Sequence, residues 1–352
     1  MLGKRLGNRA LAWGALFGIL PDLDAFLLPF LHTANQLRWH RGPSHSLLVM
    51  IAASFLLAPQ LAKLWKRDKI RKPLAGAFVF TLWGSHLLID AATVYGTSLL
   101  WPFSPNRVSF NHLFIVDFFF TMPMLVTLVW LAFLRTKKQA PKRRRLNAWG
   151  LGLATSYALL SIAMKCVASR GFEADLARRA VTYQRRMEAP TPSNILLWRA
   201  VVERSDSFWV GYRSVFESRT SPVRWTVYPK DLQTLASVIH LPEIQTLQWF
   251  TNRWWIARPH AKGAWIGDLR FDETKSWGEK KGVVDNRLAF SWNISETPQH
   301  DRLQTLAHVR KNTAETLGRI TARIFGNHEA WEANPRLAGV TGSLPEFLAV
   351  EE

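Results

Sequence analysis

The stretch PLAGAFVFTLWGSHLLIDAA, residues 73–92, decides the class of fold. It is predominantly apolar over about 20 residues, which is the length that an α-helix needs to cross a bilayer. His86 and Asp90 stand four residues apart within it and therefore lie on one face of such a helix. Ionisable side chains are costly inside a membrane and usually have a function there. The stretch predicts a membrane-spanning helix with a polar site at one end.

Four further apolar stretches accompany it. Three of them are continuous and cover residues 45–64, 113–134 and 146–166. The first apolar segment, about 10–31, contains Pro21, which disfavours helical geometry at Leu20 and predicts a kink or a helix end there. We therefore expect an α-helical membrane domain of about five spanning or re-entrant helices over residues 1–166.

The distribution of basic residues predicts the direction of these spans. Of the 45 Lys and Arg residues, 20 precede Val167, together with only 5 Asp and Glu residues. Many of them lie near the N-terminus and in two loops, residues 63–72 and 135–145, which the positive-inside rule places in the cytoplasm. Residues 167–352 are then expected outside the membrane as an extracytoplasmic domain. Because topology explains the basic excess better than nucleic-acid binding does, we expect no nucleic-acid partner.

The same topology brings six polar side chains to the outer face of the membrane. They lie at the outer ends of the first three segments and are Asp22, Asp24, His40, His45, His86 and Asp90. The break at Pro21 lets the carboxylates of Asp22 and Asp24 turn inward. The turn at Gly42-Pro43 lets the imidazole of His40, before it, and that of His45, after it, point at one ion. Cys166 is the only cysteine, so a metal in this chain must be held by His and carboxylate groups. Helix capping and ordinary interfacial contacts are the alternative interpretation.

A second polar position follows in FNHLFIVDFFF, residues 110–120. Asp117 is an unpaired carboxylate within an apolar run and is expected to point inward to a polar site. For His112 the sequence leaves two alternatives open, a metal ligand or an interfacial residue.

Several of these segments resemble a known family. WGALFGILPDLDAF (13–26), HRGPSHSLL (40–48), HLLIDAATVYGTSLLWPFSPNRV (86–108) and FIVDFFFTMPML (114–125) resemble the membrane-bound metal-dependent hydrolases of the YdjM-like, LexA-regulated group, over about residues 7–130. The resemblance implies a bacterial inner-membrane protein with hydrolase activity. It also implies the metal ligands Asp22, Asp24, His40, His45, His86 and Asp90, with Asp117 as an addition. A more distant similarity to zinc-dependent phospholipase C and related nucleases implies phosphate-ester chemistry.

The start of the chain departs from this family. Members usually begin with a short Asp/Ser-x-Thr-Gln/His-Ala-x-x-Gly segment before the first helix, whereas Met1-Leu2-Gly3 falls just after its expected place. We expect an upstream start that restores the segment to favour an enzyme, and its absence to favour a binding protein.

These features lead to one expected function and one alternative. The expected function is hydrolysis of an ester or phosphoester by water activated at a divalent metal, with zinc as the expected ion. Location in the bilayer suggests a lipid-linked substrate. The expected catalytic residues are Asp24 and Asp90, as metal-bridging or general-base carboxylates, and Arg41, which can bind an anionic phosphate. The alternative is a non-enzymatic membrane protein with a structural polar cluster and a partner-binding outer domain.

The residues after the membrane domain predict a soluble α+β domain. Period-two alternation of apolar residues predicts antiparallel strands within residues 194–216, 263–271 and 286–294. Amphipathic patterns predict helices over residues 243–255 and 313–325. This half gives little indication of chemistry.

Overall fold

The computed structural model describes residues 2–134, 137–260, 263–271, 273–274, 287–295, 301–306 and 313–331. The chain divides into two compact units. The first comprises Met1–Leu31 and Asn35–Leu160, and the second comprises His32–Ala34 and Ser161–Glu352. The domain limits 1–166 and 167–352 remain a prediction. Residues 135–136 of the predicted basic loop and Asn286 of a predicted strand lie outside the described residues.

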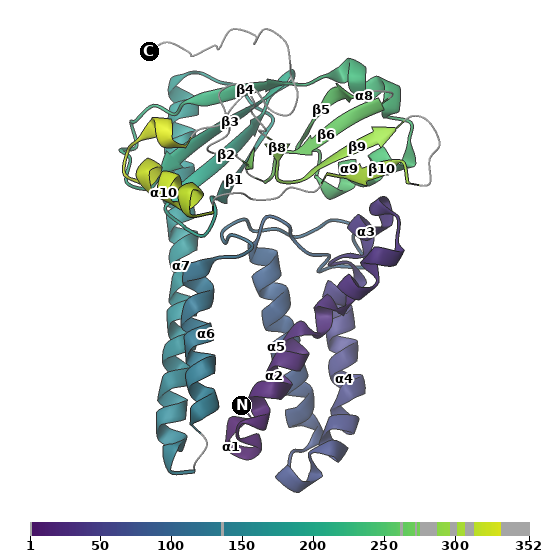
Figure 1. Cartoon of the computed structure of the whole chain (residues 1–352), viewed down its shortest axis with the longest axis vertical. Helices are drawn as coiled ribbons and strands as arrows, with labels where there is room; N and C mark the ends of the chain where they lie inside the picture. Colours follow the sequence, from purple (N-terminus) through teal and green to yellow (C-terminus); the bar gives the residue numbers. More distant parts are fainter. Residues whose placement is uncertain are drawn as a thin grey trace. The chain divides into compact units, whose positions relative to one another are not determined.

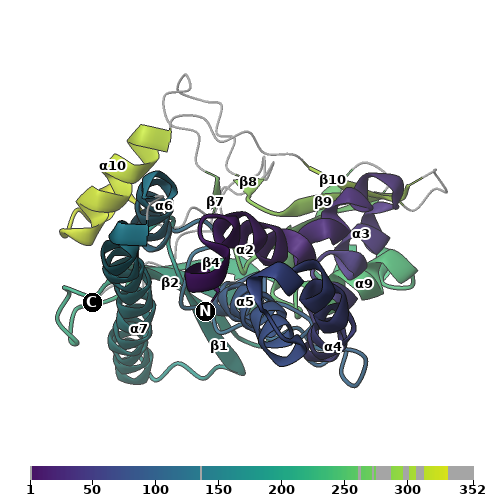
Figure 2. The same ribbon diagram turned by 90° about the horizontal axis from the view of Figure 1, so that it is seen from below.

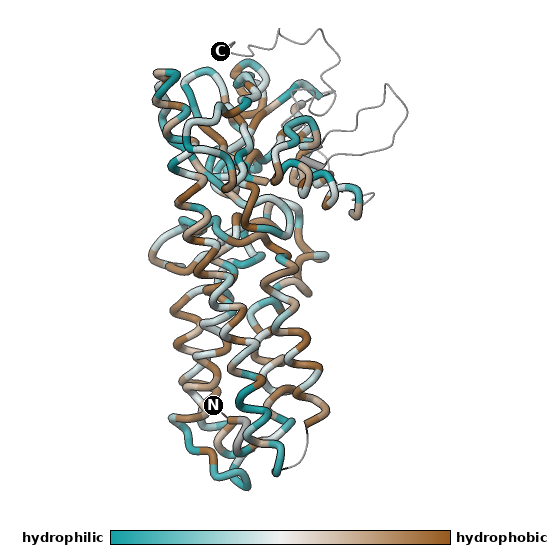
Figure 3. The backbone as a smooth tube through the Cα atoms, turned by 90° about the vertical axis from the view of Figure 1, so that its left-hand side faces the viewer, coloured by the Kyte–Doolittle hydropathy of each residue, from teal (hydrophilic) through white to brown (hydrophobic). Residues whose placement is uncertain are grey.

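The first unit is helical, as predicted (Figure 1). The α-helices up to its end are α1 (Gly3–Leu6), α2 (Arg9–Ile19), α3 (Thr33–Trp39), α4 (Leu47–Leu64), α5 (Lys72–Ala92), α6 (Phe118–Phe133) and α7 (Ala140–Arg178). Short 3-10 helices lie between them: η1 (Leu20–Phe26), η2 (Leu28–Phe30), η3 (Pro43–His45), η4 (Lys66–Asp68) and η5 (Lys137–Gln139). Among the residues that the structure describes, four helical segments are long and apolar enough to cross a membrane, and α6 is a shorter apolar helix. The four are Arg9–Phe30, Leu47–Leu64, Lys72–Ala92 and Ala140–Arg178. Apolar residues run along the helices of this unit in Figure 3.

Three helix boundaries show how local chemistry refines the sequence pattern. The α-helical geometry of α2 ends at Ile19, and Pro21 sits at the start of η1, which confirms the predicted break. Helix α6 begins five residues after the predicted start at 113, because the carboxylate of Asp117 caps it. Helix α7 extends well beyond the predicted 146–166 at both ends.

Helices α2, α4 and α5 pack together around aromatic side chains. Helices α4 and α5 lie side by side in Figure 1 and in Figure 2, which shows the same ribbon from below. Trp65 is almost fully buried (1 % exposed), and its ring meets those of Trp13 and Phe78 edge to face, with centroids 5.3 and 5.7 Å apart. This core holds α2, α4 and α5 together near the basic loop, at the ends of α4 and α5 opposite to His45 and Asp90.

In its described part, the second unit contains two four-stranded antiparallel sheets and several helices. One sheet has the order β1 (Arg185–Pro190), β2 (Leu197–Glu203), β3 (Ser207–Ser214), β4 (Trp225–Pro229). The other has the order β10 (Leu303–Thr305), β9 (Ser291–Ser295), β6 (Gly263–Asp268), β5 (Trp255–His260). The remaining elements are the pair β7 (Glu273–Thr274) and β8 (Arg287–Leu288), helices α8 (Leu232–Val238), α9 (Pro242–Phe250) and α10 (Thr313–Ile324), and η6 (His328–Ala330). The C-terminal part of α7 packs on the first sheet, where Phe172 and Trp198 are fully buried in one apolar cluster.

The predicted α+β domain is confirmed, with one helix boundary corrected. The pattern over residues 194–216 forms the hairpin β2–β3, and that over 313–325 forms α10. The helix predicted over 243–255 ends at Phe250 instead. Asn252 and Arg253 adopt positive φ angles of 50° and 58°, which an α-helix cannot contain, and the chain then enters β5.

Candidate metal centre

A tight turn between α3 and α4 carries two of the predicted ligands. Arg41 has a left-handed backbone conformation, with φ of 54°. At Gly42 a Cβ atom would lie 2.7 Å from a backbone carbonyl oxygen, so only glycine fits there. Pro43 opens η3, and the side chain of Ser46 caps α4. The sequence Gly-Pro-Ser-His-Ser thus places His45 directly at the start of α4.

Two hydrogen bonds fix the backbone of this turn. His45 is completely buried, and its carbonyl oxygen accepts a hydrogen bond from Oγ1 of Thr97 at 3.1 Å. The carbonyl oxygen of Ser44 accepts a hydrogen bond from Nε1 of Trp83 at 3.0 Å. Since Trp83 belongs to α5, the turn is tied to the helix that carries the next two ligands.

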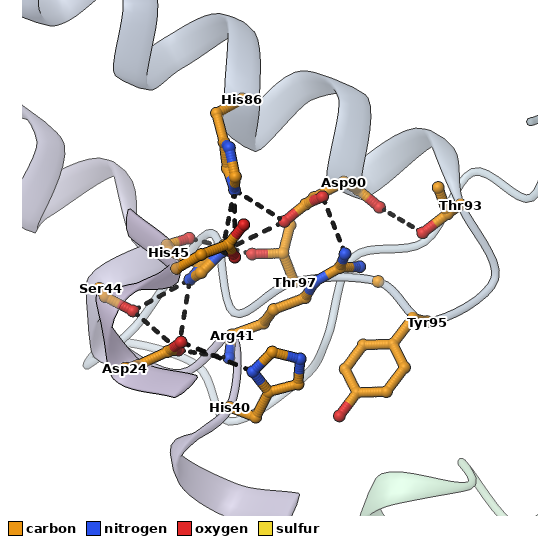
Figure 4. A network of polar contacts seen from close by, with 12 residues as sticks. Asp24, His40, Arg41, Ser44, His45, His86, Asp90, Thr93, Tyr95 and Thr97 are labelled. Carbon is orange, nitrogen blue, oxygen red and sulfur yellow. Dashed lines mark hydrogen bonds and ion pairs between the residues drawn. The ribbon is translucent and has the colours of Figure 1, made fainter. Parts of the chain in front are cut away.

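Four of the predicted ligands converge on one point: Asp22 of η1, His45 of η3, and His86 and Asp90 of α5. One ligand atom from each lies within 4.8 Å of all the others. Nε2 of His45 lies 3.2 Å from Nε2 of His86, 3.2 Å from Oδ1 of Asp22 and 3.2 Å from Oδ2 of Asp90. Nε2 of His86 lies 3.5 Å from that oxygen of Asp22 and 3.3 Å from that of Asp90. Figure 4 shows His45, His86 and Asp90 pointing toward one another.

Five of the six separations, from 3.2 to 3.5 Å, fit the edges of a coordination tetrahedron, and the sixth, between Asp22 and Asp90, is within 4.8 Å. Zinc binds imidazole nitrogen and carboxylate oxygen at about 2.0–2.1 Å, and the ligand atoms of such a tetrahedron lie about 3.3–3.4 Å apart. Oδ2 of Asp90 is buried and accepts no hydrogen bond within the described part of the chain, as an oxygen that faces a cation would. The side chain of Asp22 is 40 % exposed, whereas that of His45 is fully buried, so the group has one open side. This group could hold a metal ion.

Asp24 lies behind His45 rather than among the four ligands. Its Oδ2 accepts hydrogen bonds from the backbone N–H of Arg41 at 2.8 Å and from Oγ of Ser44 at 3.1 Å. Nδ1 of His45 lies 2.9 Å from that Ser44 Oγ and 3.7 Å from the same carboxylate oxygen. The other oxygen, Oδ1, lies 3.5 Å from Nδ1 of His40. Partners of this kind on the second ring nitrogen fix the orientation and tautomer of a metal-binding histidine.

The side chain of Arg41 meets the centre at Asp90. Its Nη2 lies 3.1 Å from Oδ1 of Asp90, the oxygen that does not face the two imidazoles. Its guanidinium also lies over the ring of Tyr95, 5.0 Å from the centroid. The ring of His40 meets the same Tyr95 edge to face. Tyr95 therefore supports two residues of the predicted site.

Asp117 is not part of this group. Its Oδ1 accepts hydrogen bonds from the backbone N–H groups of Phe119 and Phe120, and its Oδ2 accepts one from the hydroxyl of Tyr157 at 3.0 Å. The carboxylate is buried, as predicted for an inward-facing residue, but it caps α6 and contacts α7. For His112, the backbone N–H donates to the carbonyl oxygen of Ala92.

Sequence reasoning assigned no role at the centre to four residues that shape it: Ser44, Tyr95, Thr97 and Arg107. Arg107 donates hydrogen bonds to the carbonyl oxygens of His40, Tyr95 and Gly96, and so holds the loop after α5 against the turn before α4. All four stand inside the two stretches 40–48 and 86–108 whose pattern was already distinctive. Their position within those two stretches was the signal in the sequence that could have indicated a role at the centre.

Comparison with known proteins agrees with this description of the first unit. Residues 1–168 match the YdjM inner membrane protein family. The resemblance of these motifs to the YdjM family is thus confirmed, whereas hydrolase activity stays a prediction, and the family together with the apolar helices supports an inner-membrane location. No curated protein and no solved structure matches the chain.

The YdjM match spans the whole candidate centre. It includes the turn at residues 40–46, all four converging ligands and the loop that Arg107 holds, and it ends within α7. The description of the YdjM family names a membrane and no reaction. The chemistry must therefore be inferred from the residues themselves.

Proposed function

We propose that this chain is an integral inner-membrane hydrolase that depends on a divalent metal, with zinc as the ion. The observation that carries the proposal is the convergence of two imidazole nitrogens and two carboxylate oxygens, from three separate segments, within 4.8 Å. Imidazole and carboxylate are ligands that zinc accepts, and the ligand separations suit its tetrahedral geometry. A divalent ion in this place supplies Lewis-acid polarisation of an ester oxygen and a water nucleophile at neutral pH.

We further propose that the centre lies at the outer face of the membrane and that the C-terminal unit is extracytoplasmic. The basic loop between α4 and α5 lies at the opposite ends of these helices from His45 and Asp90. The N-terminus is held at the same end as that loop, because Arg9 Nη2 lies 2.6 Å from Oδ1 of Asp68. Basic residues at one end and the ligand group at the other favour a cytoplasmic N-terminus and an outward site.

The proposed roles of the surrounding residues follow from their contacts. Asp24 and Ser44 hold the imidazole of His45 so that its Nε2 faces the centre. His40 contacts the other oxygen of Asp24, and 28 % of its side chain is accessible, compared with 16 % for His86 and 0 % for His45. We assign this Asp24–His40 pair to proton transfer at the leaving group, because an imidazole can act as both acid and base and the two side chains adjoin the centre.

Metal analysis of the detergent-purified full-length chain tests the proposal. We expect zinc bound in stoichiometric amount to the wild-type chain, and a loss of most of it in His86→Ala and in His45→Ala. His240→Ala is the matched control, since His240 is an exposed histidine outside the centre, and it should retain the metal. A wild-type chain without stoichiometric metal, or a His86→Ala variant with unchanged metal content, would contradict the proposal.

Turnover separates an enzyme from a structural metal protein. The zinc-loaded chain should hydrolyse an aryl ester or an aryl phosphate, and His86→Ala should lose that activity. A chain that binds zinc but cleaves neither probe, nor a phospholipid in mixed micelles, would favour the non-enzymatic alternative.

A further inference from the structure

The backbone of Arg41 is strained, and its neighbours hold it in that state. A left-handed φ of 54° is uncommon for a residue with a side chain and costs free energy. The backbone N–H of Arg41 donates to Asp24, and its carbonyl oxygen accepts from the N–H of Ser98 at 3.3 Å. Strain that the surroundings maintain in this way is typical of residues whose side chain must be aimed at a site.

The side chain so aimed is buried and only partly satisfied. Of the Arg41 side chain 14 % is exposed, and only Nη2 meets an acceptor, Oδ1 of Asp90 at 3.1 Å. Nε and Nη1 are buried and have no hydrogen-bond acceptor among the residues that the structure describes. Buried donors of a guanidinium without acceptors are costly, which calls for an explanation.

Arg107, which lies over the same aromatic ring, provides a contrast with Arg41. Both guanidinium groups lie over the ring of Tyr95, Arg107 at 4.8 Å and Arg41 at 5.0 Å from the centroid. The nitrogens of Arg107, however, donate to three backbone carbonyl oxygens. Arg107 thus stabilises the loop, whereas Arg41 has buried donors with no acceptor among the described residues.

We propose that Arg41 binds the anionic oxygens of a phosphoryl group, and that the substrate of the centre is therefore a phosphate ester. This inference rests on the proposed function, because it places Arg41 beside a ligand of the proposed metal. Arg41 meets one oxygen of Asp90, and the other oxygen of Asp90 faces the two imidazoles (Figure 4). A phosphoryl group that contacts the ion could reach the guanidinium beside it. Several anionic oxygens can accept from donors on different edges of a guanidinium, whereas a neutral carboxylic ester offers a single carbonyl oxygen.

Binding of inorganic phosphate to the zinc-loaded, detergent-purified chain tests this inference. Calorimetric titration of Arg41→Gln should show phosphate affinity lowered by about tenfold or more, as expected for loss of a charge-assisted hydrogen bond. Arg41→Lys keeps a positive charge next to Asp90 but lacks the extra donors, so its affinity should fall as well. Arg38→Gln, in an exposed arginine of α3, is the matched control and should bind phosphate like the wild type. Zinc content is measured for each variant.

The outcomes separate this inference from the function on which it rests. Equal phosphate affinity of wild type and Arg41→Gln at equal zinc content would overturn the role of Arg41. If Arg41→Gln loses zinc, the same comparison is made with Arg41→Lys, and a phosphate affinity equal to that of the wild type at equal zinc content would overturn the role of Arg41. A zinc-loaded wild type that cleaves the aryl ester but neither binds phosphate nor cleaves the aryl phosphate would overturn the substrate class and leave the hydrolase intact. A wild type that binds no metal would reject the proposed function itself, and phosphate titration of that metal-free chain would still test Arg41.

Discussion

The Nε2 atoms of His45 and His86 face each other at 3.2 Å. A neutral imidazole carries a proton on one of its two nitrogens, so this contact is a hydrogen bond only if one Nε2 donates and the other accepts. Each of these nitrogens also faces a carboxylate oxygen of Asp22 and one of Asp90. One or two protons cannot serve all of these contacts at once, whereas a cation between the four atoms interacts favourably with every lone pair.

Zinc is therefore expected to stabilise the folded chain. A ligand that binds only the folded state at 100 times its dissociation constant adds about 2.7 kcal/mol to the free energy of unfolding. Thermal unfolding in detergent should show a melting temperature that rises with zinc and falls with a chelator. His45→Ala should abolish this zinc dependence, and His240→Ala should preserve it. A zinc response of equal size in His45→Ala would place the ion elsewhere.

Residues behind the ligands should tune the affinity for zinc without abolishing binding. Ser44→Ala removes the hydroxyl that lies 2.9 Å from Nδ1 of His45, and Asp24→Asn removes the negative charge behind it. Such changes typically lower metal affinity by about 10–100-fold. Competition with a chelator of known affinity measures the effect. Ser85→Ala, at an exposed serine next to His86, is the control and should leave the affinity unchanged.

Part of this centre could be predicted because the periodicity of a helix is simple. The i, i+4 spacing of His86 and Asp90 places them on one face whatever the rest of the chain does. The positive-inside rule then grouped the end of the first segment and the start of α4 with them, and the structure brings Asp22 and His45 to the same point.

Other parts depend on short-range geometry that periodicity does not encode. Whether Asp24 is a ligand or a partner of a ligand is decided by the local backbone geometry at Pro21 and Gly42. Asp117 has the composition of a ligand, but the free N–H groups at the start of α6 compete for it. In the second unit, β1, β4, β5 and β10 carry too weak an alternation to be predicted, because their pairing with stronger strands defines them.

Gly171 in α7 should stabilise the folded chain more than alanine would, although alanine has the higher helix propensity. A Cβ at Gly171 would overlap Nε and Cζ of Arg213, whose side chain is buried and hydrogen-bonded to the carbonyl oxygen of Ser221. Gly171→Ala should lower the free energy of unfolding by about 1–3 kcal/mol, as overpacking does. At Gly318 in α10 a Cβ meets no atom within 4 Å, so Gly318→Ala should be neutral or stabilise by up to about 1 kcal/mol. Thermal or denaturant unfolding compares the two, and a stabilised Gly171→Ala would contradict the packing.

An acid-sensitive ion pair lies in the first sheet. Burial raises the pKa of Glu203, but hydrogen bonds from Lys230 and Arg185 outweigh it and hold the pKa below its ordinary value of 4.5. A folded-state pKa below the unfolded one contributes stability above about pH 4.5, and this contribution is lost as the pH falls through the folded-state pKa. Between pH 6 and pH 3, the melting temperature of Glu203→Gln should therefore fall less than that of the wild type.

The matched control for this pH dependence lies on α10. Glu315 pairs with Arg319 at 3.2 Å, and both side chains are 38 % exposed, so solvent screens the pair. Glu315→Gln should lose stability on acidification as the wild type does. Identical pH profiles for Glu203→Gln and wild type would show that the buried pair does not contribute.

The four converging ligands belong to three segments that are separated by more than 20 and by about 40 residues along the chain. In a bilayer, lipid tails are as apolar as the helix surfaces, so the hydrophobic effect does not hold helices together. An ion bound here would act as a cross-link in a chain that has one cysteine and can form no disulfide within itself. The supply of metal would then govern how the first three helical segments assemble in the membrane, before any substrate is met.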